Sequence, residues 1–225
     1  EMLRSLVGSE MCIRDSQFDD LIVLKNNQGT DETRVRHMDY GVVLSAFFFR
    51  RFKNKENITF FDPNEVPDLY EAFYSDTELF EHLYVKYEKQ AGLRKKTMSA
   101  EEVFKSGILK ERTDTGRIYL VFIDNVMNQG PFDPEWHKIY QSNLCCEILL
   151  PTRSFKRLDD EDGRIALCTL GSINWGAFRN PEDMRRACRI LHRSLNNILD
   201  YQDFLSIQSK LSNDCLLYTS PSPRD

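Results

Sequence analysis

The chain has 225 residues, of which 41% are hydrophobic and 29% charged, the composition of a globular protein with one large domain or two small ones. No apolar run approaches the roughly 20 residues that span a bilayer and no signal peptide opens the sequence, so we expect a cytoplasmic protein without a membrane partner. The net charge of −5 argues against broad nucleic-acid binding, because phosphate contacts require clustered Lys and Arg.

The two ends of the chain look foreign to the rest. One DNA sequence that can encode LVGSEMCIRD (residues 6–15) also encodes LLYTSPSPR (residues 216–224) on its opposite strand, one base out of frame. This relationship resembles translated sequencing adapters. We therefore assign residues 1–16 and 215–225 as adapter-like, expect them to be detached from the core, and base the fold prediction on residues 17–214.

The first predicted elements are short. An apolar segment at residues 19–25 is a short strand or a helix end, and residues 26–29 form a turn. Residues 36–52 are rich in large apolar side chains and lack a two-residue alternation, which favours a buried helix.

A strand and three helices are predicted next. Residues 58–61 form the strand, and residues 65–74 and 78–89 form amphipathic helices. A capping box at residues 99–102 begins the third helix, which ends at Gly116. The buried faces of the last two helices consist of Phe80, Leu83, Tyr84, Tyr87, Val103, Ile108 and Leu109.

Three further strands are predicted in the second half. Residues 118–123 (IYLVFI) are of the kind that is buried on both faces in α/β proteins, and residues 128–131 form a loop after them. Residues 143–150 and 164–170 form two more strands, joined by an acidic turn at residues 159–163.

The last predicted helix has clear start signals. Asn180 caps it, Pro181 occupies its first turn, and Glu182 and Asp183 favour the positive end of its dipole. Its buried face consists of Met184, Cys188, Leu191, Leu195 and Ile198. No repeat or linker interrupts the chain, so we expect one incomplete α/β domain.

The segment QSNLCCEILLPT (residues 141–152) carries the candidate chemistry. In an extended chain side chains alternate between faces, so Asn143, Cys145 and Glu147 would share one face and Cys146 would lie on the other. A carboxylate among apolar residues costs several kcal/mol unless it is hydrogen-bonded or functional. This grouping of an amide, a thiol and a carboxylate indicates a site.

Other interpretations of the cysteines stay open. Six cysteines without secretory targeting indicate reduced thiols, and Cys168 lies in the next predicted strand. A free cysteine is most often a core residue, the role we assign to Cys146 and Cys188. No CxxC or HxxxH spacing supports a zinc site. Residue types alone leave open a Cys–His hydrolase and a non-catalytic α/β module with structural cysteines.

A family resemblance favours one interpretation. SNLCCEILLPT resembles the S-N-L-C-x-E-I-x-L-P-T signature of the large, catalytic subunit of class I ribonucleotide reductases. VLKNNQGTDETRVRHMDYGV, TGRIYLVFIDNV, GRIALCTLGSINWGAF and NILDYQDF resemble the same family in the same order. The resemblance implies that residues 17–214 are an internal fragment of a ten-stranded α/β barrel whose finger loop carries a cysteine.

The resemblance also implies a role for each candidate residue. Cys145 would form a thiyl radical that removes hydrogen from the 3′ carbon of the ribose. Glu147 would accept the proton of the 3′ hydroxyl, and Asn143 would orient that carboxylate and the sugar hydroxyls, so both would bind substrate. Cys168 would supply one half of a redox-active dithiol that ends as a disulfide.

Partners are likewise implied by the resemblance. The substrate would be a ribonucleoside diphosphate, a metal-containing small subunit would supply the radical, and thioredoxin or glutaredoxin would reduce a homodimer of large subunits. ATP and deoxynucleotide effectors would bind parts of the allosteric parent enzyme that are largely absent here. We expect this chain to bind no metal or cofactor directly and to be inactive alone.

Overall fold

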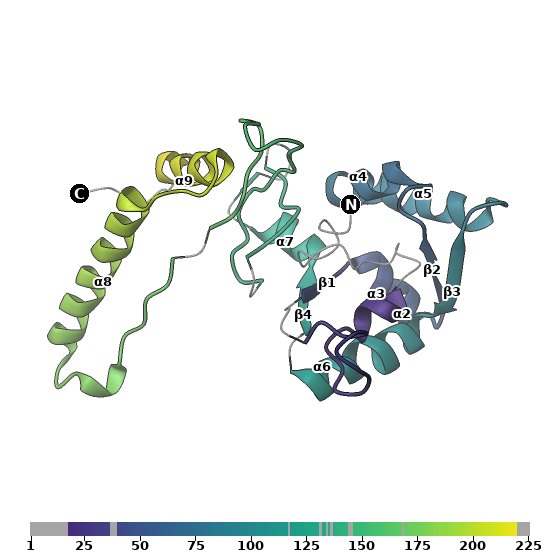
Figure 1. The fold of residues 1–225 in the computed structure, drawn as a ribbon, viewed down its shortest axis with the longest axis horizontal. Helices are drawn as coiled ribbons and strands as arrows, with labels where there is room; N and C mark the ends of the chain where they lie inside the picture. The colour runs from purple at the N-terminus through teal and green to yellow at the C-terminus, as the bar shows by residue number, and fades with distance from the viewer. Residues whose placement is uncertain are drawn as a thin grey trace. The chain divides into compact units, whose positions relative to one another are not determined.

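The computed structural model describes residues 18–36, 40–116, 118–130, 132–133, 135, 137–143, 146–167 and 169–219, the last five of them as backbone only. They form two compact units, unit 1 up to Pro151 and unit 2 from Thr152 onwards (Figure 1). No linker composition marks this division. The adapter-like residues 1–16 and 220–225 lie outside the described residues, so the adapter assignment stays a prediction.

Unit 1 contains two pairs of strands. Strand β1 (Tyr40–Leu44) pairs in parallel with β4 (Ile118–Phe122). Strand β2 (Asn57–Phe61) pairs antiparallel with β3 (Lys95–Ser99). The two pairs appear on opposite sides of the helices α2 and α3 in Figure 1. This combination of helices with parallel and antiparallel strands confirms the α/β class.

The predicted helix over residues 36–52 is wrong in its first half. The chain forms β1 there, and α3 (Ala46–Lys53) follows. Every residue of β1 is buried, and a strand covered on both faces carries consecutive apolar residues without alternation. Ser45 separates the two elements, because its side chain accepts a hydrogen bond from the Phe48 amide (3.3 Å) and caps α3.

The other early elements confirm the predictions. The segment at residues 19–25 begins as the short helix α2 (Phe18–Ile22), and the strand at residues 58–61 is β2. The two amphipathic helices are α4 (Pro67–Ser75) and α5 (Thr77–Lys89). The whole predicted face of α5 is buried, namely Phe80, Leu83, Tyr84 and Tyr87.

The helix before β4 contains a π-helical segment, η1 (Glu102–Leu109), which continues into α6 (Lys110–Thr115). Val103 and Ile108 are buried as predicted, but Leu109 is 36% exposed, which contradicts the prediction. In a π-helix the hydrogen bonds join residues five apart, so Val103 and Ile108 share a face and Leu109 turns away from it. The helix ends as predicted at Gly116, whose φ of 68° suits glycine.

Strand β4 is shorter and less buried than predicted. Helix α7 (Ile123–Gln129) takes the last residue of the predicted strand and the first two of the predicted loop at 128–131. Phe122 is 41% exposed. Only Ile118 of β4 is buried, so the expected burial on both faces is wrong for this strand.

Aromatic rings fill the core of unit 1. The Phe47 ring lies 4.9 Å from that of Tyr84 and 5.7 Å from that of Phe80, and the Phe61 ring lies 5.4 Å from Tyr84. Edge-to-face contacts of this kind add to the hydrophobic gain from burying the rings. The core therefore joins α3, β2 and α5 into one body.

Two of the predicted strands do not form. Residues 143–150 and 164–170 contain no strand among their described residues, because a strand requires a hydrogen-bonded neighbour. A single antiparallel bridge between Arg153 and Arg164 closes the predicted acidic turn at residues 159–163.

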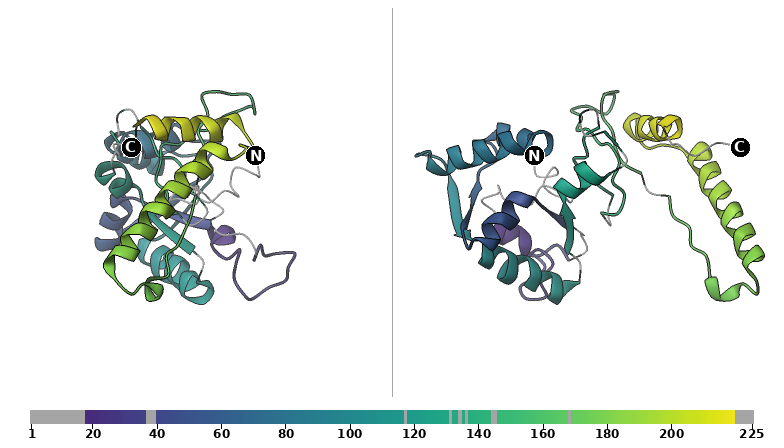
Figure 2. Two further views of the ribbon diagram at one scale, coloured as in Figure 1. Left: turned by 90° about the vertical axis from the view of Figure 1, so that its left-hand side faces the viewer. Right: turned by 180° about the vertical axis from the view of Figure 1, so that it is seen from behind.

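Unit 2 contains the short helix η2 (Trp175–Ala177) and two longer helices, α8 (Pro181–Tyr201) and α9 (Ile207–Thr219). Figure 2 shows α8 as one continuous helix. Its predicted cap is confirmed, because Asn180 Oδ1 accepts a hydrogen bond from the Asp183 amide at 2.9 Å. Its predicted buried face is wrong. Met184, Leu191 and Leu195 are half-buried, while Cys188 and Ile198 are exposed. An amphipathic pattern predicts which side of a helix is apolar, but that side is buried only where another element packs against it.

Candidate functional site

Asn143 and Glu147 meet in a tight loop of unit 1. Asn143 Nδ2 donates a hydrogen bond to Glu147 Oε1 at 2.6 Å. The Cys146 amide donates to the Asn143 carbonyl at 3.0 Å, and Cys146 has a φ of 59°. On an extended strand the Cα atoms of Asn143 and Glu147 would be about 13 Å apart. Asn143 and Glu147 thus lie together through a tight loop, and the predicted alternation along a strand is wrong. The predicted cluster of these two residues with Cys145 stays a prediction, because Cys145 lies outside the described residues.

The orientation of the Asn143 side chain follows from the backbone of the loop. Asn143 Oδ1 accepts hydrogen bonds from the amides of Glu147 (3.1 Å) and Ile148 (3.0 Å). Because its oxygen faces these donors, its amino group must face the Glu147 carboxylate. The side chain thus closes the loop and binds the carboxylate at the same time.

Ser142 also takes part in this loop, although it is not among the site residues predicted from the sequence. Its Oγ donates to the Ile148 carbonyl at 2.6 Å and lies 3.1 Å from Asn143 Oδ1. The available signal was the Ser-Asn pair itself, because both residue types hydrogen-bond to nearby backbone in turns.

Helix α4 positions the segment that leads into the loop. Ile139 is buried, and the Lys138 ammonium donates to the Ser75 carbonyl at 3.2 Å. Tyr140 Oη donates to Glu71 Oε1 at 3.0 Å. The loop therefore begins from a chain segment that is anchored on both sides of Ile139.

The environment of the loop is polar and open. Glu147 is exposed, and Ser142 and Asn143 are half-buried. A hydrogen-bonded carboxylate in such a place can accept a proton from a hydroxyl group within hydrogen-bond reach.

The cysteines are less fully described. Cys145 and Cys168 lie outside the described residues, so their predicted roles stay predictions. Cys146 is half-buried and Cys188 is exposed. The core role assigned to Cys188 is therefore wrong, because the face of α8 that carries it is not covered.

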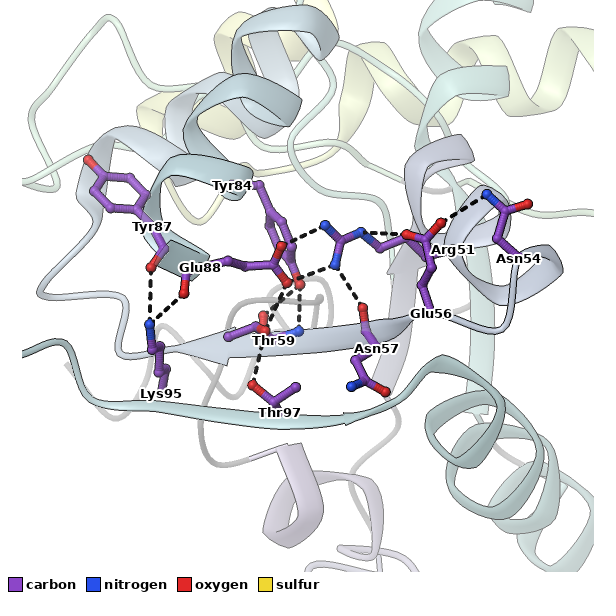
Figure 3. Close-up of polar contacts among 10 residues, drawn as sticks. All are labelled: Arg51, Asn54, Glu56, Asn57, Thr59, Tyr84, Tyr87, Glu88, Lys95 and Thr97. Carbon is purple, nitrogen blue, oxygen red and sulfur yellow. Dashed lines mark hydrogen bonds and ion pairs between the residues drawn. The ribbon is translucent and has the colours of Figure 1, made fainter. Parts of the chain in front are cut away.

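A second polar cluster lies inside unit 1 (Figure 3). The Arg51 guanidinium donates to both oxygens of Glu88, at 2.7 and 2.6 Å. Thr59 Oγ1 donates to Glu88 Oε1 at 2.9 Å, and its backbone exchanges two hydrogen bonds with Tyr84 Oη. Arg51 also lies over the Phe47 and Tyr84 rings. These bonds connect α3, β2 and α5, so the cluster has a structural role in unit 1.

The pKa shifts in this cluster agree with a structural role. Burial raises the pKa of Tyr84, because the phenolate would lose its hydration. Burial alone would lower the pKa of Arg51, but its hydrogen bond and charge contact with Glu88 raise it. Both shifts keep the groups in the protonation state that they already have at neutral pH.

A hollow of about 340 Å³ at the carboxyl ends of β1 and β4 is the alternative candidate site. Ligands often bind at this edge of a parallel sheet. However, Asp124 already accepts a hydrogen bond from the Ala46 amide at 2.7 Å, and Arg50 is ion-paired with Glu81. Two of the charged groups that line the hollow are thus already engaged within the protein.

Neither a metal-binding cluster nor a membrane-spanning helix occurs among the described residues. Among them, no three His, Cys, Asp or Glu side chains are grouped as they would be around a metal ion. No helix in the described ranges is both long and apolar enough to cross a membrane.

The similarity to known proteins extends over most of the chain. The family described as "Ribonucleotide reductase, barrel domain" matches residues 10–215. The alpha subunit of ribonucleoside-diphosphate reductase from Haemophilus influenzae is 46% identical over 197 residues, covering 88% of this chain and 26% of the relative. The phage T4 alpha subunit is 40% identical over 191 residues, covering 84% and 25%. The alpha subunit of reductase 1 from Escherichia coli is 48% identical over 137 residues, covering 61% and 18%. The chain spans about a quarter of the length of the first relatives.

Proposed function

The chain belongs to the ribonucleotide reductase barrel-domain family, and from this membership we propose that its parent protein reduces ribonucleoside diphosphates to 2′-deoxyribonucleoside diphosphates. This is the reaction class that the names of its relatives state. The proposed fold of the complete domain is a ten-stranded α/β barrel with Cys145 on its finger loop.

The observation that carries this proposal is the pair formed by Asn143 and Glu147 within the signature segment. Their 2.6 Å hydrogen bond holds a carboxylate two residues from the proposed radical cysteine. A carboxylate in that place can take the proton of the 3′ hydroxyl. The amide group holds the carboxylate and contributes to binding the sugar hydroxyls.

The radical step is assigned to Cys145. Its sulfur radical takes a hydrogen atom from C3′, which forms an S–H bond and leaves a carbon radical. The S–H bond is close in strength to a sugar C–H bond, so the exchange is feasible. The 2′ hydroxyl then leaves as water, with the two electrons and two protons supplied by a dithiol that includes Cys168 and ends as a disulfide. Return of the hydrogen atom from Cys145 to C3′ completes the product and restores the sulfur radical.

The partners proposed for the parent protein follow from the same membership. They are a radical-generating, metal-containing small subunit, a second large subunit, and thioredoxin or glutaredoxin as reductant. ATP and deoxynucleotides act as effectors on other parts of that protein. The proposed location is the cytoplasm.

Cysteine substitution in the full-length subunit tests the radical assignment. Cys145→Ser is expected to abolish turnover, because an O–H bond is too strong for the exchange. Cys146→Ser, the matched control on the adjacent residue, is expected to keep most activity. Turnover that survives the first change and is lost with the second would overturn the assignment.

Glu147→Gln tests the function of the loop. It keeps the shape of the side chain and removes the base, and removal of a general base typically lowers the rate about 10²- to 10⁴-fold. The alternative function, a non-catalytic module with structural cysteines, instead predicts that this exposed residue can be changed without loss of turnover.

A further inference from the structure

The hydroxyl group of Ser142 joins the two ends of the loop that carries Asn143 and Glu147. Its 2.6 Å hydrogen bond to the Ile148 carbonyl links residues six positions apart, one on each side of that pair. A hydroxyl group has only one hydrogen to donate, and it points mainly at the Ile148 carbonyl because that bond is the shorter. The 3.1 Å contact with Asn143 Oδ1 is therefore the weaker of the two.

Two backbone amides, those of Glu147 and Ile148, donate to the oxygen of the Asn143 side chain, and the Ser142 hydroxyl makes the weaker contact beside them. This convergence prevents the amide group from rotating, so its nitrogen stays directed at the Glu147 carboxylate. Ser142 is half-buried, so its bonds compete only partly with water.

Resting on the function proposed above, we infer that Ser142 is a positioning residue for proton transfer to Glu147. By closing the loop it holds the Ile148 amide against Asn143 Oδ1, so it acts through Asn143, and it does not contact the reacting atoms. A general base that is displaced by about 1 Å can lower the rate about 10²-fold. The position of the loop should therefore affect the rate of the chemical step more than it affects the binding of substrate.

The test is the kinetics of Ser142→Ala in the full-length subunit with its small subunit. We expect kcat to fall about tenfold and KM to change less than about twofold, since only the alignment of the base is lost. Ser142→Thr keeps the hydroxyl group and should restore kcat to within about threefold of the parent. Ser194→Ala is the matched control, because Ser194 Oγ also donates to a backbone carbonyl, that of Ile190 (2.9 Å), within α8.

A second substitution separates positioning from general stability. If Ser142 acts through the amide, Ser142→Ala should lower kcat no further in an Asn143→Ala background. An unchanged kcat for Ser142→Ala, or the same tenfold loss in both backgrounds, would overturn the inference. Full activity of Glu147→Gln would overturn both the proposed function and this inference. An inactive Glu147→Gln together with a fully active Ser142→Ala would overturn only the inference about Ser142.

Discussion

The two units of this chain bury different kinds of side chain. In unit 1 the buried set is almost entirely apolar and includes Phe48, Phe60, Phe61 and Tyr84. In the described part of unit 2 no apolar side chain is buried, and the buried polar residues are Thr152, Gln208, Ser209, Ser212 and Asn213. Large apolar residues of unit 2 are instead exposed, such as Leu158, Leu170, Trp175 and Leu205.

This difference indicates that the hydrophobic effect stabilises unit 1 from within, whereas unit 2 depends mainly on helix formation and hydrogen bonds. The candidate loop belongs to unit 1, where α4 anchors the chain before it. Exposed apolar residues in unit 2 are an aggregation liability. We therefore expect the isolated chain to be poorly soluble, and stability measurements require low protein concentration.

The largest difference between the units should come from apolar side chains. Phe48 is fully buried, so Phe48→Ala should cost about 3–5 kcal/mol of the free energy of unfolding. Leu205 is fully exposed, and Leu205→Ala should change that free energy by less than about 0.5 kcal/mol. Pulse proteolysis in urea measures both, and equal effects would show that the units do not differ in this way.

A matched pair of arginines gives the next largest effect. Arg51 donates two hydrogen bonds to Glu88 (2.7 and 2.6 Å) and Arg157 donates two to Asp159 (2.9 and 2.8 Å). The Arg51 side chain is 13% exposed and that of Arg157 78%. Arg51→Ala should therefore cost about 2–3 kcal/mol, because it leaves the mostly buried Glu88 carboxylate without its opposite charge.

The same change in unit 2 should have less effect. Arg157→Ala should cost below about 1 kcal/mol, since water and salt screen an exposed pair. Urea titrations of both variants provide the measurement. A cost for Arg157→Ala as large as that for Arg51→Ala would mean that burial does not decide the strength of these pairs.

A smaller effect is expected at Gln208, the fully buried side chain of α9. Its amide nitrogen donates to the carbonyls of Leu158 (3.1 Å) and Asp160 (2.7 Å). Gln208→Ala should cost about 1–2 kcal/mol, confined to unit 2. Hydrogen exchange should accelerate in α9 and in the turn at residues 158–160. Gln208→Glu, which points a carboxylate at the same carbonyls, should be worse. Faster exchange throughout unit 1 would contradict the independence of the units.

The smallest effect concerns pH. Tyr87 Oη donates to the Asp68 carboxylate at 2.7 Å, and this bond, with burial, raises the pKa of Tyr87 from 10.0 to about 12. A raised pKa in the folded state stabilises unit 1 below pH 10, and that contribution is lost as the pH rises through about 12. Tyr87→Phe should remove this fall in stability at high pH, and it should cost below about 1 kcal/mol of the free energy of unfolding at neutral pH. The measurement is the free energy of unfolding against pH, with tyrosinate absorbance followed in parallel. The same fall in the Tyr87→Phe variant would exclude Tyr87 as its source.

Local signals in the sequence predicted local structure well. The caps at Asn180 and Gly116 and the buried face of α5 depend on residues within a few positions, and all three are confirmed. Elements that depend on distant partners were predicted less well. β1 was taken for a helix because its cover, including β4, comes from much later in the chain. β3 was missed because its exposed, lysine-containing sequence lacks an apolar pattern.

The candidate site divides in the same way. The residue types indicated Asn143 and Glu147, and their contact is confirmed. The loop that joins them was not predicted, because it depends on a positive φ at a cysteine, for which no local pattern exists. The contribution of Ser142 depends on the same loop and was missed for the same reason.

The left-handed backbone of Cys146 has a consequence for protein engineering. With a φ of 59°, this position suits glycine and asparagine, whereas a side chain branched at Cβ would add about 1–3 kcal/mol of strain. A library that removes this thiol should therefore use Gly, Asn or Ser and leave out Val, Ile and Thr. The backbone at residue 146 thus limits which side chains can stand next to Cys145 in the sequence.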